Sequence, residues 1–193
     1  MVFSIPTALA RTPFKTFAAN YTSAYSAQIL RAIVSDPSHP LCLARTRKEK
    51  QKERSGLWWH VTVNHNASST KVVRTWITRR LRTAFNDELR LRGITYDGKL
   101  TRGKSGFTHR SALSRMMQEG KSLSLTGSIR LHCKPALVTA KYEEVRQETG
   151  KAVDILLRGL EADKMEKEVR SAQQTYTQKF PRPRGQRQME EHD

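Results

Sequence analysis

Cysteine is scarce in this sequence, and long apolar runs are missing. Its 193 residues include two cysteines, Cys42 and Cys133, which lie far apart and outside any CxxC pair. Such sparse usage excludes a disulfide-rich scaffold and fits a reducing compartment, and a structural zinc site lacks its ligands. The apolar stretches fall far short of the roughly 18–20 residues that a spanning helix needs, so we expect no membrane span.

Acidic residues are also few, and their shortage is local. The chain carries 35 Lys and Arg against 18 Asp and Glu, a formal net charge of +17. Residues 70–110 hold eleven basic and three acidic side chains, whereas residues 141–170 hold seven and eight. A localised charge of this size raises the self-repulsion of a folded domain, and nucleic acid is the polyanion that most often offsets it.

The first acid is Asp36, so residues 1–35 contain none, although Arg11, Lys15 and Arg31 are present. Apolar residues recur there at helical spacing, and they include Phe14, Phe17, Ala18 and Tyr21. An acid-free, Ser/Thr-bearing amphipathic start is typical of a mitochondrial transit peptide. We therefore interpret residues 1–35 as a targeting segment or, alternatively, as an N-terminal arm with a docked helix at 18–34.

Residues 36–56 form a predicted basic linker. Six of the ten residues at 45–54 are Lys or Arg and none is apolar. A run of this kind either lies on phosphates or is a solvated linker. At the other end, residues 166–193 are charged and poor in apolar side chains, which predicts a disordered polar tail.

Between these segments, residues 57–165 show the periodicities of one folded domain. The predicted elements are, in order, a strand at 57–63, a helix at 70–92, a hairpin at 94–101, a short helix at 108–119, a strand at 123–133 and a helix from about 139. Asp97-Gly98 predicts a type I′ turn in the hairpin. The interpretation is an α+β fold: a small two-layer β-α-(hairpin)-α-β-α sandwich with an extended basic N-terminal arm and a disordered C-terminal tail.

The predicted helix at 70–92 is apolar on one side and rich in guanidinium groups on the other. Its expected core residues are Val73, Trp76, Ile77, Leu81, Ala84, Phe85 and Leu89. The basic stripe on this helix and the loop that follows predict an RNA-binding surface. The candidate RNA-binding residues are Lys71, Arg74, Arg79, Arg82, Arg90, Lys99, Arg102, Lys104 and Arg110.

The segment Gly98–Ser105 formally matches G-x-x-x-x-G-K-S, the phosphate loop of nucleotide-binding proteins. That chemistry needs a preceding strand, a helix that starts at Lys104 and an acid on a later strand for magnesium. Asp97-Gly98 is better explained as a hairpin turn, so we interpret the match as incidental and expect no enzyme. We predict no catalytic residue, no metal ligand and no cofactor.

Aromatic residues and histidines add two further hypotheses. Trp58 and Trp76 are candidates for stacking on RNA bases, although Trp76 lies on the expected core face and helices on both sides of the sheet would bury Trp58. His60 and His132 fall on strands and could share a polar face. Neither has an acid nearby on its strand, which favours surface or hydrogen-bonded histidines over a metal or general-base role.

Together these features predict a structural RNA-binding protein of the mitochondrial matrix. The expected partners are RNA, in particular ribosomal RNA, and neighbouring proteins of a ribonucleoprotein such as the mitochondrial ribosome, as a component or an assembly factor. Two alternatives stay open. One is an RNA- or nucleotide-processing enzyme that uses Gly98–Ser105, and the other is a basic protein-interaction subunit of a larger complex. A nuclear or cytoplasmic location is the alternative to the matrix.

Overall fold

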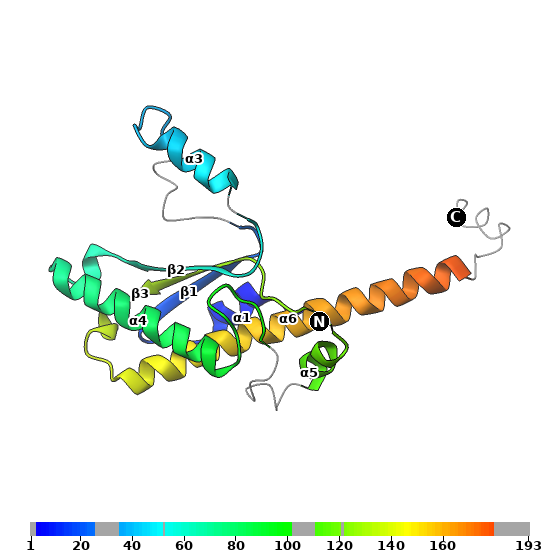
Figure 1. Cartoon of the computed structure of the whole chain (residues 1–193). Coiled ribbons are helices and arrows are strands. Elements are labelled where there is room, and N and C mark those ends of the chain that lie inside the picture. Colours follow the sequence, from blue (N-terminus) through cyan, green and yellow to red (C-terminus); the bar gives the residue numbers. More distant parts are fainter. Residues whose placement is uncertain (1–2, 26–34, 52, 102–110, 121, 180–193) are drawn as a thin grey trace, which may run out of the picture.

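The computed structural model describes residues 3–25, 35–51, 53–101, 111–120 and 122–179. In chain order they form α1 (Ile5–Arg11), β1 (Phe17–Thr22), α3 (Cys42–Gln51), β2 (Trp58–Val63), η2 (His65–Ala67), α4 (Lys71–Leu91), α5 (Ser111–Gln118), β3 (Ser128–Cys133), η4 (Pro135–Leu137) and α6 (Tyr142–Lys179), where η marks a short 3-10 turn. Helices and a three-stranded sheet together make the predicted α+β fold (Figure 1).

The sheet has the strand order β1-β3-β2, with β3 at its centre. β2 runs parallel to β3, with Val61 opposite Leu131, and β1 runs antiparallel to it, with Ala19 also opposite Leu131. Parallel neighbours need a crossover connection, and α4, the hairpin and α5 supply it between β2 and β3.

One face of the sheet carries the core. The side chains of Phe17, Ile129 and Leu131 are fully buried there, and Trp59 and Val61 join them. α4 and α6 pack against each other on this side of the sheet, and α1 packs against β1 and α6 (Figure 1). The fully buried residues from the two long helices include Ile77, Leu81, Phe85, Leu89, Val145 and Leu156.

The N-terminal segment departs from the predicted helix at 18–34. Phe17–Thr22 is a strand, in which Phe17 and Ala19 face the core and Asn20 and Thr22 are exposed. The same residues fit helical spacing, but an alternating pattern fits them as well, and pairing with the free edge of β3 decides between the two. Residues 26–34 lie outside the described residues.

A carboxylate on α6 fixes the entry to β1. Glu148 accepts hydrogen bonds from the backbone N–H groups of Lys15 (2.8 Å) and Thr16 (3.0 Å) and from the Thr16 hydroxyl (2.5 Å). Lys134 donates from its side chain to the Phe14 carbonyl at 2.6 Å and from its backbone to the Thr16 carbonyl. With Leu9 and Phe14 buried as well, the segment before β1 belongs to the folded body.

The hairpin after α4 is present, but its turn differs from the predicted type I′. Ile94 bridges to Leu100, and the Gly98 N–H donates to the Thr95 carbonyl at 2.9 Å. A type I′ turn needs positive φ at both central residues. Among the described residues only glycines have positive φ, here Gly98 at 81°, so Asp97 does not meet that requirement.

The C-terminal helix is longer than the sequence pattern predicts. α6 continues to Lys179, about 57 Å from its start at 1.5 Å per residue, and its distal half projects from the body (Figure 1). The predicted disorder is therefore wrong for residues 166–179, where pairs such as Glu166–Arg170 at 2.6 Å support an exposed helix. Residues 180–193 lie outside the described residues. None of the described helices is both long and apolar enough to cross a membrane.

Replacing Glu148 with Ala should destabilise the fold by about 1–3 kcal/mol, because three donors at the entry to β1 lose their acceptor and Thr16 is 2% exposed. Urea unfolding followed by circular dichroism measures the change. Glu144→Ala, at an exposed position of the same helix, is the matched control and should cost less than about 1 kcal/mol. Equal losses in the two variants would contradict the anchoring role.

Candidate nucleic-acid interface

The orientation of α4 about its axis decides which of its basic side chains reach solvent. Ile77, Leu81 and Phe85 are fully buried against the sheet and α6. The only acids of the helix, Asp87 and Glu88, both turn toward α6. The opposite side of α4 therefore carries no acid.

Glu88 is the centre of an ionic network between α4 and α6. Its carboxylate contacts the Arg92 guanidinium at 2.6 Å and the Arg146 guanidinium at 2.9 Å. Arg92 also donates from Nε and Nη2 to the two oxygens of Asp154, at 2.9 and 3.1 Å. A guanidinium that meets a carboxylate with two parallel bonds fixes both distance and orientation, so the network sets the register of the two helices.

The network affects the pKa of Arg92 and packs closely against a glycine. Burial acts to lower the pKa of Arg92, but its hydrogen bonds to Asp154 and Glu88 outweigh that effect and raise the pKa above its ordinary value. Gly150 leaves room for the ions, since a Cβ at this position would lie 3.0 Å from both Arg92 Nη2 and Glu88 Oε2.

The second acid of α4, Asp87, also contacts α6. It accepts a hydrogen bond from the Tyr142 hydroxyl at 2.9 Å. Burial, and then this hydrogen bond, raise the pKa of Tyr142 above its ordinary value.

Two more arginines of α4 are used inside the protein. Arg74 donates from Nη1 to the carbonyls of Ser68 and Ser69, both at 2.7 Å, and so closes the loop before the helix. Arg80 donates to the Ala140 carbonyl at 2.6 Å. Arg74 was predicted to contact RNA; its position among backbone carbonyls makes it a contributor to the local structure as well.

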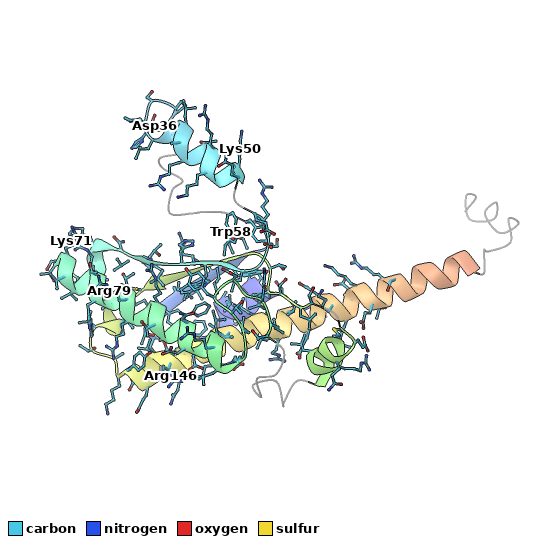
Figure 2. The ribbon with its side chains drawn as sticks, viewed as in Figure 1. Asp36, Lys50, Trp58, Lys71, Arg79 and Arg146 are labelled. Atoms are coloured by element: carbon cyan, nitrogen blue, oxygen red, sulfur yellow. The ribbon has the colours of Figure 1, made fainter. Side chains whose placement is uncertain are left out.

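Four of the predicted RNA-binding residues remain on the outer side of α4. Lys71, Arg79, Arg82 and Arg90 are exposed, and none of them forms an ion pair with another described residue. At 100° per residue they fall within about 100° of one another around the axis, along about 28 Å of helix. We call these four residues the basic face of α4 (Figure 2 labels Lys71 and Arg79).

The other predicted contacts lie beyond α4. Lys99 is exposed in the hairpin, where it lines a depression together with the acids Glu53 and Asp97. Arg102, Lys104 and Arg110 lie outside the described residues. In the formal phosphate-loop match, Gly98 is preceded by the end of α4 and a short hairpin arm instead of a strand of the sheet.

Of the two candidate stacking residues, Trp76 is placed differently from the sequence interpretation, and Trp58 is covered. Trp76, expected in the core, is 47% exposed on α4. Trp58 and Trp59 are each 9% exposed, so both sides of β2 are covered at this point. Trp58 meets the Tyr25 ring edge to face, at 5.2 Å between centroids, and Trp59 packs on Phe85. Trp76 is therefore the aromatic residue of the three that a ligand can reach.

Histidines and cysteines are placed as structural groups. His60 and His132 lie on the face of the sheet away from the core, as predicted, and no strand position on that face is an Asp or Glu. His132 Nδ1 lies 3.0 Å from the Thr62 hydroxyl. Burial raises the pKa of the Cys133 thiol to about 11, which keeps it protonated at neutral pH. Within the described ranges, no three His, Cys, Asp or Glu residues gather where they could hold a metal ion.

A second basic segment stands apart from the sheet. α3 carries Arg47, Lys48 and Lys50 on exposed positions, with Arg45 half-buried (Figure 2). Figure 1 shows this helix well separated from α4 and α6.

Comparisons with protein-family models, curated proteins and solved structures found no match for this chain.

Glu88→Ala should lower the free energy of unfolding by about 2–3 kcal/mol, because Arg92 and Arg146 would face each other without the carboxylate between them. The loss should stay below that of a fully buried pair, since the two arginine side chains keep 20% and 39% of their exposure. Denaturant unfolding is the measurement. Arg90→Gln, on the outer side of the same helix, should change stability by less than about 0.5 kcal/mol. A stable Glu88→Ala variant would show that the network does not hold the helices together.

Proposed function

We propose that this protein binds RNA through the basic face of α4, as a structural component or assembly factor of a ribonucleoprotein, with the mitochondrial ribosome as the favoured particle. One observation supports this more than any other. Lys71, Arg79, Arg82 and Arg90 share one exposed helix surface, while both acids of that helix are engaged with α6. The four charges therefore remain available to an external polyanion.

Arginine suits such a role because its planar fork binds phosphate oxygens in pairs and stays charged at any physiological pH. Contacts to phosphates supply affinity without reading sequence, and each one releases counterions. The exposed cations of α3 add a second surface of the same sign. A protein with two basic surfaces is suited to holding RNA in place.

The double variant Arg79→Gln/Arg82→Gln should bind RNA more weakly and with a shallower salt dependence. Two lost phosphate contacts should reduce the log–log slope by about 1.4–1.8. Fluorescence anisotropy over a salt series measures this. Thermal stability should be nearly unchanged, because exposed charges contribute little to folding. Lys151→Gln/Lys167→Gln removes the same charge from exposed positions of α6 and should leave the slope as it is. An unaltered slope in the α4 variant would move the RNA contact elsewhere.

The two alternative roles have distinct outcomes. If the protein still sediments with its partner after nuclease treatment, and binds no RNA after purification, it is a basic subunit that binds an acidic protein. Nucleotide hydrolysis by the purified chain that Lys104→Ala abolishes would point to the enzyme. Co-sedimentation that nuclease disrupts supports the proposed RNA-binding role.

The mitochondrial address is proposed from the acid-free residues 1–35, and the fold limits how it could be processed. Leu9, Phe14 and Phe17 are buried, and β1 forms one edge of the sheet. We expect the chain recovered from mitochondria to retain residues 9–22, as intact-mass measurement of its N-terminus would show. A mature chain that begins after Thr22 would contradict this expectation, and a diffuse cytosolic signal from the full-length protein would contradict the location.

A further inference from the structure

An exposed tryptophan on a basic helix is the most unusual surface feature of the described chain. Trp76 is 47% exposed, and residue 79, one helical turn further on, is an exposed arginine. The one large apolar side chain beside it on the outer side of α4 is Val72, at 79% exposure. About half of this apolar indole surface stays in contact with water unless a ligand covers it.

The indole is held in place by a fixed cation. The Arg80 guanidinium carbon lies 5.0 Å from the centre of the Trp76 ring and 6.0 Å from that of Tyr142. Arg80 is itself fixed by its donation to the Ala140 carbonyl at 2.6 Å, and Tyr142 by its bond to Asp87. This arrangement limits the rotamers of Trp76, so that little conformational entropy remains to be lost when a flat ligand binds.

We propose that Trp76 is a stacking platform for an unpaired RNA base, with the basic face of α4 holding the phosphates that flank it. This inference rests on the proposed RNA-binding function and narrows its substrate to RNA with single-stranded or bulged nucleotides. Bases inside a duplex already stack on one another, so that an aromatic side chain reaches only a base that has left the helix. A base on the open part of the indole extends the stack that Arg80 and Trp76 begin.

Charge favours RNA over a protein partner at this position. A protein that buried Trp76 by apolar contact would also cover the exposed positions next to it on α4, which are Val72, Arg79 and Thr83. Of these, only Val72 has a side chain that is wholly apolar. An aromatic ring among cations matches the combination that single-stranded nucleic acid requires, a surface for bases next to charges for the backbone.

The intrinsic fluorescence of the full-length protein tests the proposal directly. Trp58, Trp59 and Trp76 are its three tryptophans, and the first two are 9% exposed. Acrylamide, a neutral quencher, should therefore act mainly on Trp76. A single-stranded RNA should reduce acrylamide access, and a blunt duplex of equal length should have little effect. The Trp76→Phe variant should lose most of the quenchable fluorescence.

Affinity supplies the second arm. Trp76→Ala should bind single-stranded RNA roughly 5- to 100-fold more weakly, with its salt slope unchanged because no phosphate contact is lost. Trp76→Phe keeps a ring and should retain part of the affinity, which also guards against a folding defect in the alanine variant. Val72→Ala, an exposed apolar change one turn away, should bind as the parent does.

The outcomes separate this inference from the proposed function. Salt-dependent RNA binding with full affinity in Trp76→Ala, or equal affinity for duplex and single strand, would overturn the stacking platform and leave the basic face of α4 intact. An absence of RNA binding in the parent protein would overturn both. Loss of a protein partner in Trp76→Ala with RNA affinity unchanged would assign Trp76 to a protein interface instead.

Discussion

The ionic network around Glu88 is the constraint on which the surface of this protein depends. A helix such as α4, with apolar side chains over part of its circumference, can rotate by some tens of degrees and still bury most of them. Arg92 and Arg146, which converge on Glu88 from the two helices, allow much less freedom, because charged hydrogen bonds at 2.6–3.0 Å tolerate little displacement. The rotation that they select points Asp87 and Glu88 inward and Arg79 and Arg90 outward.

This arrangement separates two uses of arginine within one helix. Arg74, Arg80 and Arg92 donate hydrogen bonds to backbone carbonyls or to carboxylates within the protein. Lys71, Arg79, Arg82 and Arg90 have no such partner among the described residues. Composition alone cannot make this distinction, because every basic residue adds the same charge to the total. Arg74 bonds carbonyls of the loop just before the helix. For Arg80 and Arg92 the difference comes from tertiary contacts with Ala140 and with α6, which follow α4 by more than forty residues.

Local patterns predicted the elements whose signals are long or end on glycine. The alternation at 57–63 became β2, and the apolar stripe of 70–92 became α4, which Gly93 ends with a φ of 66°. β1 was missed because six residues fit both periodicities and its partner, β3, is more than a hundred residues away. Trp76 was misplaced because it precedes Ile77 by one residue, and one residue is about 100° of helix, enough to move a side chain from core to solvent.

The N-terminal residues show how one stretch of sequence can satisfy two requirements at once. Two features of this stretch resemble a transit peptide: it contains no acid, and its apolar residues recur every few positions. An edge strand that packs its apolar side chains in the core next to a carboxylate needs the same two features. An acid at position 15 or 16 would face Glu148, whose oxygens already accept three hydrogen bonds from these two residues. Phe14 and Phe17, stacked with 4.8 Å between their ring centroids, fill the core whether or not they ever meet an import receptor. The absence of acids therefore has a structural cause over residues 14–17, and a targeting role has to be argued from the residues on either side of them.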